Sequence, residues 1–390
     1  MIKNKLQGEN VCFIKKCLKI VALLLACLMC LGFVSCNTNE TSEDADDSET
    51  TTENESPNTD KAPEEENKIV TKVYDLASIT DSLKIFGRYS TVEDGITCDF
   101  TASGIEFSAY IVGELKLSLV CTAPTYYTVY VDNVKSPERI FADASTTELT
   151  LASFDEGGEH TIRFLKQTEA RHSLSVLKSL EMTGYWLDAP KKNDYYIEFI
   201  GDSISCGFGN VATGKVPDEA EYADGTQSFA YLTAEKLGTD FSIIGCGGIG
   251  LVTTGYVDVV ESDFYTKQSY FRSATEPYSP ERTPDLVVVN LGTNDQNKTA
   301  NAKQFKEKVT ELINLIRETY GSTVTIVWCY GMMNDGMITY AQQAINEMRN
   351  VYVCQLTKNQ KGGSSHPDLE GHVTAAEELT AFIQKEGLLG

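Results

Sequence analysis

The sequence predicts two folded parts of different class, an all-β sandwich over residues 68–190 and a doubly wound α/β sheet over residues 191–390. In the first part apolar residues alternate with period two, as in half-buried strands. In the second part short apolar runs alternate with amphipathic helical patterns, which is typical of parallel βα units. The chain after residue 67 is also longer than one compact core usually holds.

Residues 1–35 have the pattern of a secretory signal peptide. Five lysines precede an apolar run from Ile20 to Val34, and these 15 residues are fewer than the roughly 20 that span a bilayer. Ser35 directly before Cys36 resembles a bacterial lipobox, although Phe33 stands where such boxes usually carry Leu. We therefore expect a secreted lipoprotein, held on the bacterial cell surface by a lipid on Cys36, with ordinary secretion as the alternative.

Residues 36–67 are expected to form an acidic, disordered linker. From Asn37 to Asn67 there are 12 acidic residues, one lysine and almost no apolar side chain, too little to offset chain entropy. The whole chain has a formal net charge of −23. Without the signal peptide the net charge is −27, and the linker contributes −11 of it. The remaining charge of −16 argues against nucleic acid or anionic lipid as the partner and favours a neutral substrate.

Six cysteines remain in the two folded parts once the signal peptide and Cys36 are set aside. They lack the paired spacing of zinc or redox motifs, so the sequence predicts buried free thiols and no metal or other cofactor. These residues are Cys98, Cys121, Cys206, Cys246, Cys329 and Cys354.

The first folded part contains alternating apolar runs and no long helical pattern. One run has Ile105, Phe107, Ala109 and Ile111 on one face, and the next has Leu115, Leu117 and Leu119. Glycine and Asp-Asn breaks are predicted to be turns between strands. They are Val112-Gly-Glu, Val131-Asp-Asn and Glu156-Gly-Gly. A β-sandwich of jelly-roll type fits this pattern best.

The second part has five short apolar runs, as expected of parallel strands buried on both faces. The runs are 196–200, 241–244, 286–291, 324–328 and 351–354. The clearest helix is predicted over Ala302 to Tyr320, with Gly321 as its end, and the last over His372 to Lys385. Ligands of such sheets bind beyond the carboxyl ends of the strands, so catalytic residues are expected there.

Four residues follow predicted strands in positions that suit a serine hydrolase. Ser203 follows the first run in Gly201-Asp-Ser, where a serine is also a common helix cap. Gly248 lies in the glycine-rich turn after the second run, and Asn294 follows the third. Each offers a donor for an oxyanion. His366, between the last run and the last helix, is the one histidine placed to be the general base.

These four blocks resemble the SGNH (GDSL-type) hydrolases, a flavodoxin-like superfamily, over about residues 195–390. The resemblance implies that Ser203 is nucleophile and oxyanion donor, that Gly248 and Asn294 complete the hole, and that His366 is the base. Asp202 and Asp295 are candidate supporting residues. Many members carry an Asp two or three residues before the histidine. Here Gly363 and Ser364 stand there, which predicts a Ser-His dyad oriented by a backbone carbonyl or another nearby group.

The first part resembles the N-terminal jelly-roll domain of carbohydrate esterase family 2. The matching segments are Phe86-Gly-Arg, Ser103-Gly-Ile-Glu-Phe, Tyr130-Val-Asp-Asn and Gly158-Glu-His-Thr-Ile-Arg, with Lys166 and Glu169. This resemblance implies a metal-free, acetyl xylan esterase-like carboxylic ester hydrolase that deacetylates plant polysaccharides such as xylan and glucomannan.

Two other functions stay open from the sequence. One is a non-catalytic glycan-binding surface lipoprotein, and the other is a lipase or thioesterase with the same machinery. Aromatic residues between Leu251 and Pro284, Tyr256 among them, are candidates for a sugar groove, and so is Trp328. Packing of these rings into the protein is the alternative interpretation.

Overall fold

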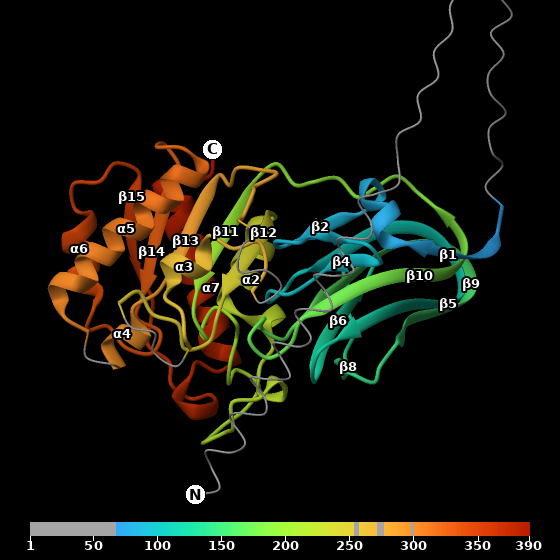
Figure 1. Ribbon diagram of the computed structural model, residues 1–390, viewed down its shortest axis with the longest axis horizontal. Coiled ribbons are helices and arrows are strands. Elements are labelled where there is room, and N and C mark those ends of the chain that lie inside the picture. The colour runs from blue at the N-terminus through green and yellow to red at the C-terminus, as the bar shows by residue number, and fades with distance from the viewer. Residues whose placement is uncertain (1–67, 253–256, 271–276, 298–299) are drawn as a thin grey trace, which may run out of the picture. The chain divides into compact units, whose positions relative to one another are not determined.

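The computed structural model describes residues 68–252, 257–270, 277–297 and 300–390, which form an all-β part followed by an α/β part (Figure 1). The predicted signal peptide, Cys36 and the acidic linker lie outside the described residues. The predicted boundary near residue 190 falls between the last strand of the all-β part and the first strand of the α/β part. Within the described ranges, no helix combines the length and apolar character that a membrane crossing requires.

The all-β part contains ten strands and two short 3-10 helices. Their bounds are β1 Val70–Asp75, η1 Leu76–Ser78, η2 Thr80–Ser82, β2 Lys84–Phe86, β3 Thr91–Val92, β4 Gly95–Thr97, β5 Gly104–Cys121, β6 Thr125–Val131, β7 Val134–Lys135, β8 Ile140–Ala142, β9 Glu148–Lys166 and β10 Ser175–Trp186. The strands pair in the order β3-β4-β10-β5-β9-β6-β7, with β1 on β10, β2 on β5 and β8 on β6.

Two of the three predicted turns are wrong, because β5 and β9 run through them as long strands paired with each other (Figure 1). Gly113 has φ 75° and forms a bulge at which the register with β9 shifts, so the chain bends without leaving the sheet. Gly157 lies under the Tyr110 ring, where a Cβ would come within 2.2 Å of the hydroxyl. The third turn is confirmed: Asp132 and Asn133, both with positive φ, connect β6 to β7.

The apolar alternation predicts the core of the all-β part correctly. All seven residues of the two runs are buried in one cluster, together with Phe164 of β9 and Leu180 of β10. Because successive side chains on a strand point to opposite faces, this burial accounts for the period of two. The six cysteines of the folded parts are buried free thiols, as predicted.

The α/β part has a five-stranded parallel sheet in the order β12-β11-β13-β14-β15, the flavodoxin-like order. Its elements are β11 Tyr196–Gly201, η3 Ala220–Tyr222, η4 Gly225–Gln227, α2 Phe229–Leu237, β12 Asp240–Gly245, α3 Glu261–Tyr265, β13 Leu286–Asn290, α4 Thr293–Asn297, α5 Ala302–Tyr320, β14 Thr325–Tyr330, α6 Ile338–Ile345, β15 Val351–Gln355, η5 Gly363–Ser365 and α7 Leu369–Glu386. All five strand predictions are confirmed.

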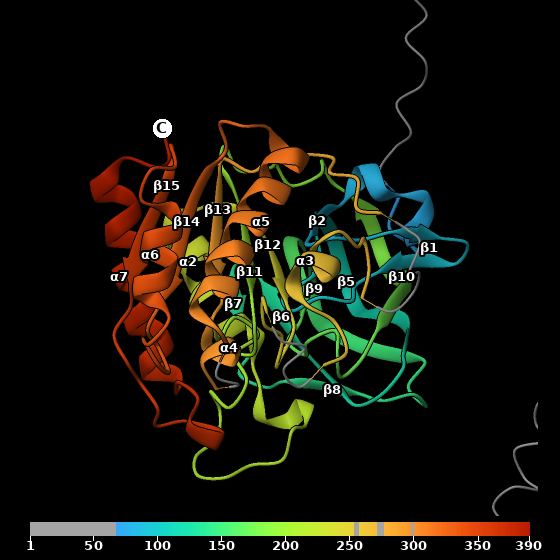
Figure 2. The same ribbon diagram turned by 60° about the vertical axis from the view of Figure 1, so that its left-hand side comes forward.

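Helices cover both faces of this sheet, as its doubly wound topology requires (Figure 2). Side chains of α3, α5 and α6 pack with Val287 and Val289 of β13, whereas α2 and α7 pack with Val288 on the other face. Helix α5 has the predicted bounds. Helix α7 begins before His372, because the Asp368 side chain accepts a hydrogen bond from Gly371 N and caps it.

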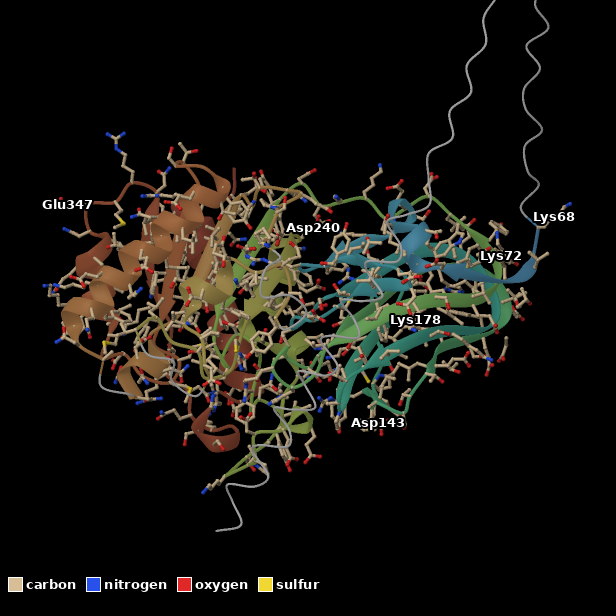
Figure 3. All side chains as sticks on the ribbon, viewed as in Figure 1. Lys68, Lys72, Asp143, Lys178, Asp240 and Glu347 are labelled. Carbon is tan, nitrogen blue, oxygen red and sulfur yellow. The ribbon has the colours of Figure 1, made fainter. Side chains whose placement is uncertain are left out.

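Buried ion pairs and apolar contacts connect the two parts. Arg88 donates to Glu198 on β11 at 3.3 Å, and both side chains are buried. Lys84 pairs at 2.6 Å with Asp240, the first residue of β12, which is labelled in Figure 3. Phe86 stacks on Phe241 with ring centroids 4.9 Å apart. The all-β part therefore shares a core with the α/β part.

Candidate active site

Ser203 lies just beyond the carboxyl end of β11, next to the point where the strand order reverses. Its Oγ is 2.9 Å from Nε2 of His366, within hydrogen-bonding distance. Gly201, the last residue of β11, is required for space, because a Cβ there would lie 2.0 Å from the hydroxyl oxygen of Ser205. The close approach of the Ser205 side chain, and not a left-handed backbone conformation, therefore explains why glycine begins the Gly201-Asp-Ser motif.

His366 lies in a strained loop that is bound to a second loop. Ser364 and Ser365 have φ of 51° and 62°, unusual for residues other than glycine. The Ser364 hydroxyl donates to Val216 O at 3.0 Å, and Gly363 N donates to Gly209 O at 2.8 Å. These contacts fix the backbone that carries the imidazole.

The partner of His366 Nδ1 is the backbone carbonyl of Ser364, at 3.3 Å. Asp368 is instead the cap of α7, and its carboxylate also accepts from Asn359 Nδ2 at 2.8 Å. The Phe208 ring packs edge-on against the imidazole at 4.9 Å. Burial lowers the pKa of His366 below its ordinary value, so the ring is neutral at pH 7 and able to accept a proton.

The glycine-rich turn after β12 is held by three acidic or amide side chains. Gly247 N donates to Glu169 of the all-β part at 2.5 Å. Leu251 N donates to Asp295 at 3.0 Å, and Asn294 Nδ2 donates to Ile249 O at 2.8 Å. Gly248, inside this turn, has φ 84°. Such fixed backbone donors are the usual means of stabilising an oxyanion.

Asp202 and Asp295, the candidate supporting residues, are both fully buried and both accept backbone or amide hydrogen bonds. Asp202 accepts from Ile204 N at 2.9 Å and from Asn294 Nδ2 at 3.2 Å. Burial, together with the nearby carboxylates Asp295 and Glu169, raises the pKa of Asp202 to about 7. Both aspartates therefore support the loops around the site.

One pocket of about 300 Å³ brings together all four predicted site residues. The residues that line it are Arg171, Ser203, Phe208, Val216, Asp218, Gly247, Gly248, Thr293, Asn294, Asn297, Met333, Ser364 and His366. Because the strands are parallel, their carboxyl ends place these widely separated residues side by side.

Of the two candidate sugar-contacting residues, one prediction is wrong and one is untested. Trp328 has no exposed surface and lies in the core between β14 and α5, because the side chains of a central parallel strand are buried on both faces. Tyr256 lies outside the described residues. Phe264 and Tyr265 of the same aromatic segment are also buried in this core.

Four polar residues near the pocket were not predicted to have a role. Glu169 is 1% exposed, and Arg171 bridges it at 3.1 Å to Asp218, with contacts of 2.6 and 2.7 Å to the latter. His172 Nε2 also lies 3.0 Å from Asp218. No local pattern marks them, because Asp218 lies 47 residues from Arg171 and 46 residues from His172 along the chain.

The α/β part has the fold of the GDSL-type hydrolases, and residues 199–359 match the GDSL-like Lipase/Acylhydrolase family. Residues 85–190 match the Carbohydrate esterase 2 N-terminal family. The two matches confirm the predicted resemblance of the α/β part to the GDSL-type hydrolases and of the all-β part to the N-terminal domain of carbohydrate esterase family 2.

Alignments with similar proteins cover both the all-β part and the α/β part. The chain is 30% identical over 329 residues to the cellulase/esterase CelE of Acetivibrio thermocellus, an alignment that covers 77% of this chain but 39% of that longer protein. It is 23% identical to an acetylxylan esterase / glucomannan deacetylase of Cellvibrio japonicus, with 81% and 92% covered. A solved family two carbohydrate esterase from Clostridium thermocellum, in complex with cellohexaose, has a TM-score of 0.74 at 27% identity, with 79% and 100% covered.

Proposed function

We propose that this protein is a serine esterase that removes O-acetyl groups from plant cell-wall polysaccharides, namely xylan, glucomannan or oligosaccharides derived from them. The observation that carries the proposal is the 2.9 Å contact of Ser203 Oγ with His366 Nε2, in a pocket also lined by Gly248 and Asn294. The names of the relatives, an acetylxylan esterase / glucomannan deacetylase and a cellulase/esterase, support the substrate class.

In the first half of the reaction, Ser203 Oγ attacks the acetyl carbonyl carbon while His366 Nε2 takes the hydroxyl proton. The carbonyl oxygen becomes an oxyanion, for which Ser203 N, Gly248 N and the Asn294 amide are the proposed donors. The Asn294 amide already donates to Ile249 O and Asp202, so it would have to share or exchange one of these bonds. Collapse breaks the bond to the sugar oxygen, which receives the proton from His366.

In the second half, His366 takes a proton from water, and the resulting hydroxide attacks the acetyl group on Ser203. Collapse releases acetate and returns the proton to Ser203 Oγ. The Ser364 carbonyl, 3.3 Å from Nδ1, accepts the hydrogen of that nitrogen and stabilises the imidazolium that forms in each half. The dyad therefore obtains its orientation from the backbone.

The lining of the pocket favours an acetyl ester of a sugar over a long acyl chain. Arg171, Asp218 and Asn297 present charged or amide groups around the dyad, and these suit neighbouring sugar hydroxyls better than a hydrocarbon. A lipase or thioesterase needs an apolar channel for its acyl chain instead.

Three further features that the sequence predicts are part of the proposal. The strands of the all-β part are proposed to follow a jelly-roll arrangement, with domain limits at 68–190 and 191–390. Residues 1–35 are proposed to be a signal peptide, and residues 36–67 a linker attached to lipid through Cys36. The enzyme would then act outside the cell, on the bacterial surface.

Acetate release by the mature protein, from an aryl acetate and from acetylated xylan and glucomannan, tests this function. We expect release by the wild type and none above background by Ser203→Ala, with unchanged thermal unfolding as the control for folding. Hydrolysis of long-chain aryl esters or acyl thioesters but not of acetylated glycans would identify a lipase or thioesterase. Glycan binding without ester hydrolysis would identify a binding protein.

A further inference from the structure

A second hollow, of about 380 Å³, adjoins the active-site pocket and shares Asp218 with it. Its lining residues are Pro124, Tyr126, Phe141 and His172 of the all-β part and Asp218, Glu219, Ala220 and Glu221 of the α/β part. We propose that this hollow, here called the flanking groove, binds sugar units of a neutral polysaccharide beyond the acetylated unit in the active site. The inference rests on the proposed function for the identity of that polysaccharide.

One wall of the flanking groove is aromatic and formed by two paired strands. Phe141 of β8 lies directly opposite Tyr126 of β6, and their ring centroids are 5.3 Å apart at 60°. Phe141 is 48% exposed although it is a large apolar side chain. Strand β8 pairs with β6 alone among the described strands, so this ring is not covered by a further strand. A sugar ring packed on it would remove apolar surface from water.

This aromatic wall is held in place before any ligand binds. The Arg139 guanidinium lies 4.1 Å from the centroid of the Tyr126 ring. The same group donates to the backbone carbonyls of Glu221, at 2.9 Å, and Ala223, at 2.5 Å. Arg139 therefore connects the aromatic wall to the opposite wall, and little ordering is needed when a ligand binds.

The opposite wall presents three exposed carboxylates, those of Asp218, Glu219 and Glu221. Carboxylates accept hydrogen bonds from sugar hydroxyls and repel the negative charge of uronic acids. Asp218 is fixed by its contacts with Arg171 and His172, and it borders both the groove and the active-site pocket. An uncharged glycan chain that leaves the active site past Asp218 thus lies between two walls. On one side carboxylates accept hydrogen bonds from its hydroxyl groups, and on the other side an aromatic ring packs against its sugar rings.

Binding of unsubstituted xylohexaose and mannohexaose, measured by calorimetry, tests the groove without requiring turnover. The full mature chain carrying Ser203→Ala is compared with the same chain carrying Phe141→Ala in addition. We expect the added substitution to weaken binding of at least one hexasaccharide about fivefold or more, from the loss of one aromatic contact. The matched control is Tyr185→Ala, whose ring stacks on Tyr110 elsewhere in the all-β part. Equal affinity of the Phe141→Ala chain and its parent, or no binding by the parent, would overturn the inference.

An activity measurement separates this inference from the proposed function. In the chain with Ser203 intact, Phe141→Ala is expected to lower the ratio of kcat/KM on acetylated polysaccharide to kcat/KM on aryl acetate, whereas Tyr185→Ala leaves it unchanged. Glu219→Gln with Glu221→Gln is expected to improve use of a glucuronic acid-substituted xylan relative to an unsubstituted one. If the wild type is active and Phe141→Ala has the same ratio as the wild type, the role proposed for the flanking groove is wrong and the proposed esterase function stands. If the wild type is inactive on all esters, the proposed esterase function is wrong. The calorimetric result then decides by itself whether the flanking groove binds glycan.

Discussion

The carboxylate of Glu169, in the all-β part, accepts a hydrogen bond at 2.5 Å from the backbone N–H of Gly247, 78 residues further along the chain. Gly247 precedes the proposed oxyanion donor Gly248. A Cβ on Gly247 would lie 2.7 Å from Glu169 Oε1 and 2.8 Å from Arg171 Nη2, so the turn is packed closely against both side chains. The all-β part therefore positions the turn at residues 245–250, called the oxyanion loop below after its proposed role, as well as flanking the site.

Replacing Glu169 is expected to slow catalysis through this loop. Loss of an oxyanion donor itself costs about 10²–10³ in rate, so displacement of the loop by Glu169→Ala is expected to lower kcat about tenfold or more. Glu169→Gln keeps an acceptor for Gly247 N and should recover most of that loss. Steady-state kinetics on an aryl acetate measure both effects, with kcat changing more than KM.

The control for this series is Glu159→Ala, because Glu159 is an exposed glutamate on β9, away from the oxyanion loop. Its kinetics should equal those of the wild type. Wild-type kcat in Glu169→Ala would show that the loop keeps its geometry without this contact.

Ser203 and His366 are expected to act as one unit. Ser203→Ala and His366→Ala should each lower kcat by at least about 10³-fold, and the double variant should be no slower than either, because the serine is a weak nucleophile without its base. Kinetics of the three variants check this. Additive losses in the double variant would mean that the two residues contribute independently.

The pH dependence of kcat/KM should show a basic group whose pKa lies below the ordinary histidine value. Burial lowers the pKa of His366, and the neutral ring is the active form, so kcat/KM should fall in acid with a midpoint below the ordinary histidine value of about 6.5. A pH profile of kcat/KM on an aryl acetate measures the midpoint. A midpoint above the ordinary value would mean that a negative charge, and not burial, dominates the environment of the ring.

Asp368→Asn is expected to leave this profile and kcat unchanged within about twofold, since Asn is as good a helix cap as Asp. If Asp368 were the third member of a catalytic triad, the same substitution would cost about 10⁴-fold in kcat. The variant thus distinguishes a backbone-oriented dyad from a triad.

Breaking the ion pair of Arg88 and Glu198 should be strongly destabilising, because each side chain is almost fully buried and the remaining charge would lose its partner. Arg88→Ala leaves the carboxylate with Tyr265 and Tyr320 as hydroxyl donors but without its cation, and is expected to lower the free energy of unfolding by about 3–5 kcal/mol. Chemical denaturation measures the loss. The double variant Arg88→Ala with Glu198→Gln should recover part of it, and no recovery would assign the loss to packing.

The sequence predicted the parallel strands closely because each is a short apolar run between polar segments. It also placed Ser203, Gly248, Asn294 and His366 at the proper ends of those strands. Local patterns are sufficient here, since the carboxyl ends of parallel strands meet at one edge of the sheet. The buried thiols and the helix over Ala302 to Tyr320 were predictable for the same reason, as they depend on local composition and periodicity.

Contacts between residues far apart along the chain account for the features that the sequence left open or predicted wrongly. Glycine segments predicted to be turns lie inside β5 and β9, because the two strands continue to hydrogen-bond across them. Trp328 is core and not a sugar contact, since burial depends on which helices cover a strand. The Glu169 contact with Gly247 and the contact of Arg171 with Asp218 join segments that are far apart along the chain, through geometry that no local pattern encodes. The sequence by itself determined the two classes of fold and the chemical groups at the strand ends. Only the tertiary structure decided how the all-β part completes the site, because that depends on contacts between residues far apart along the chain.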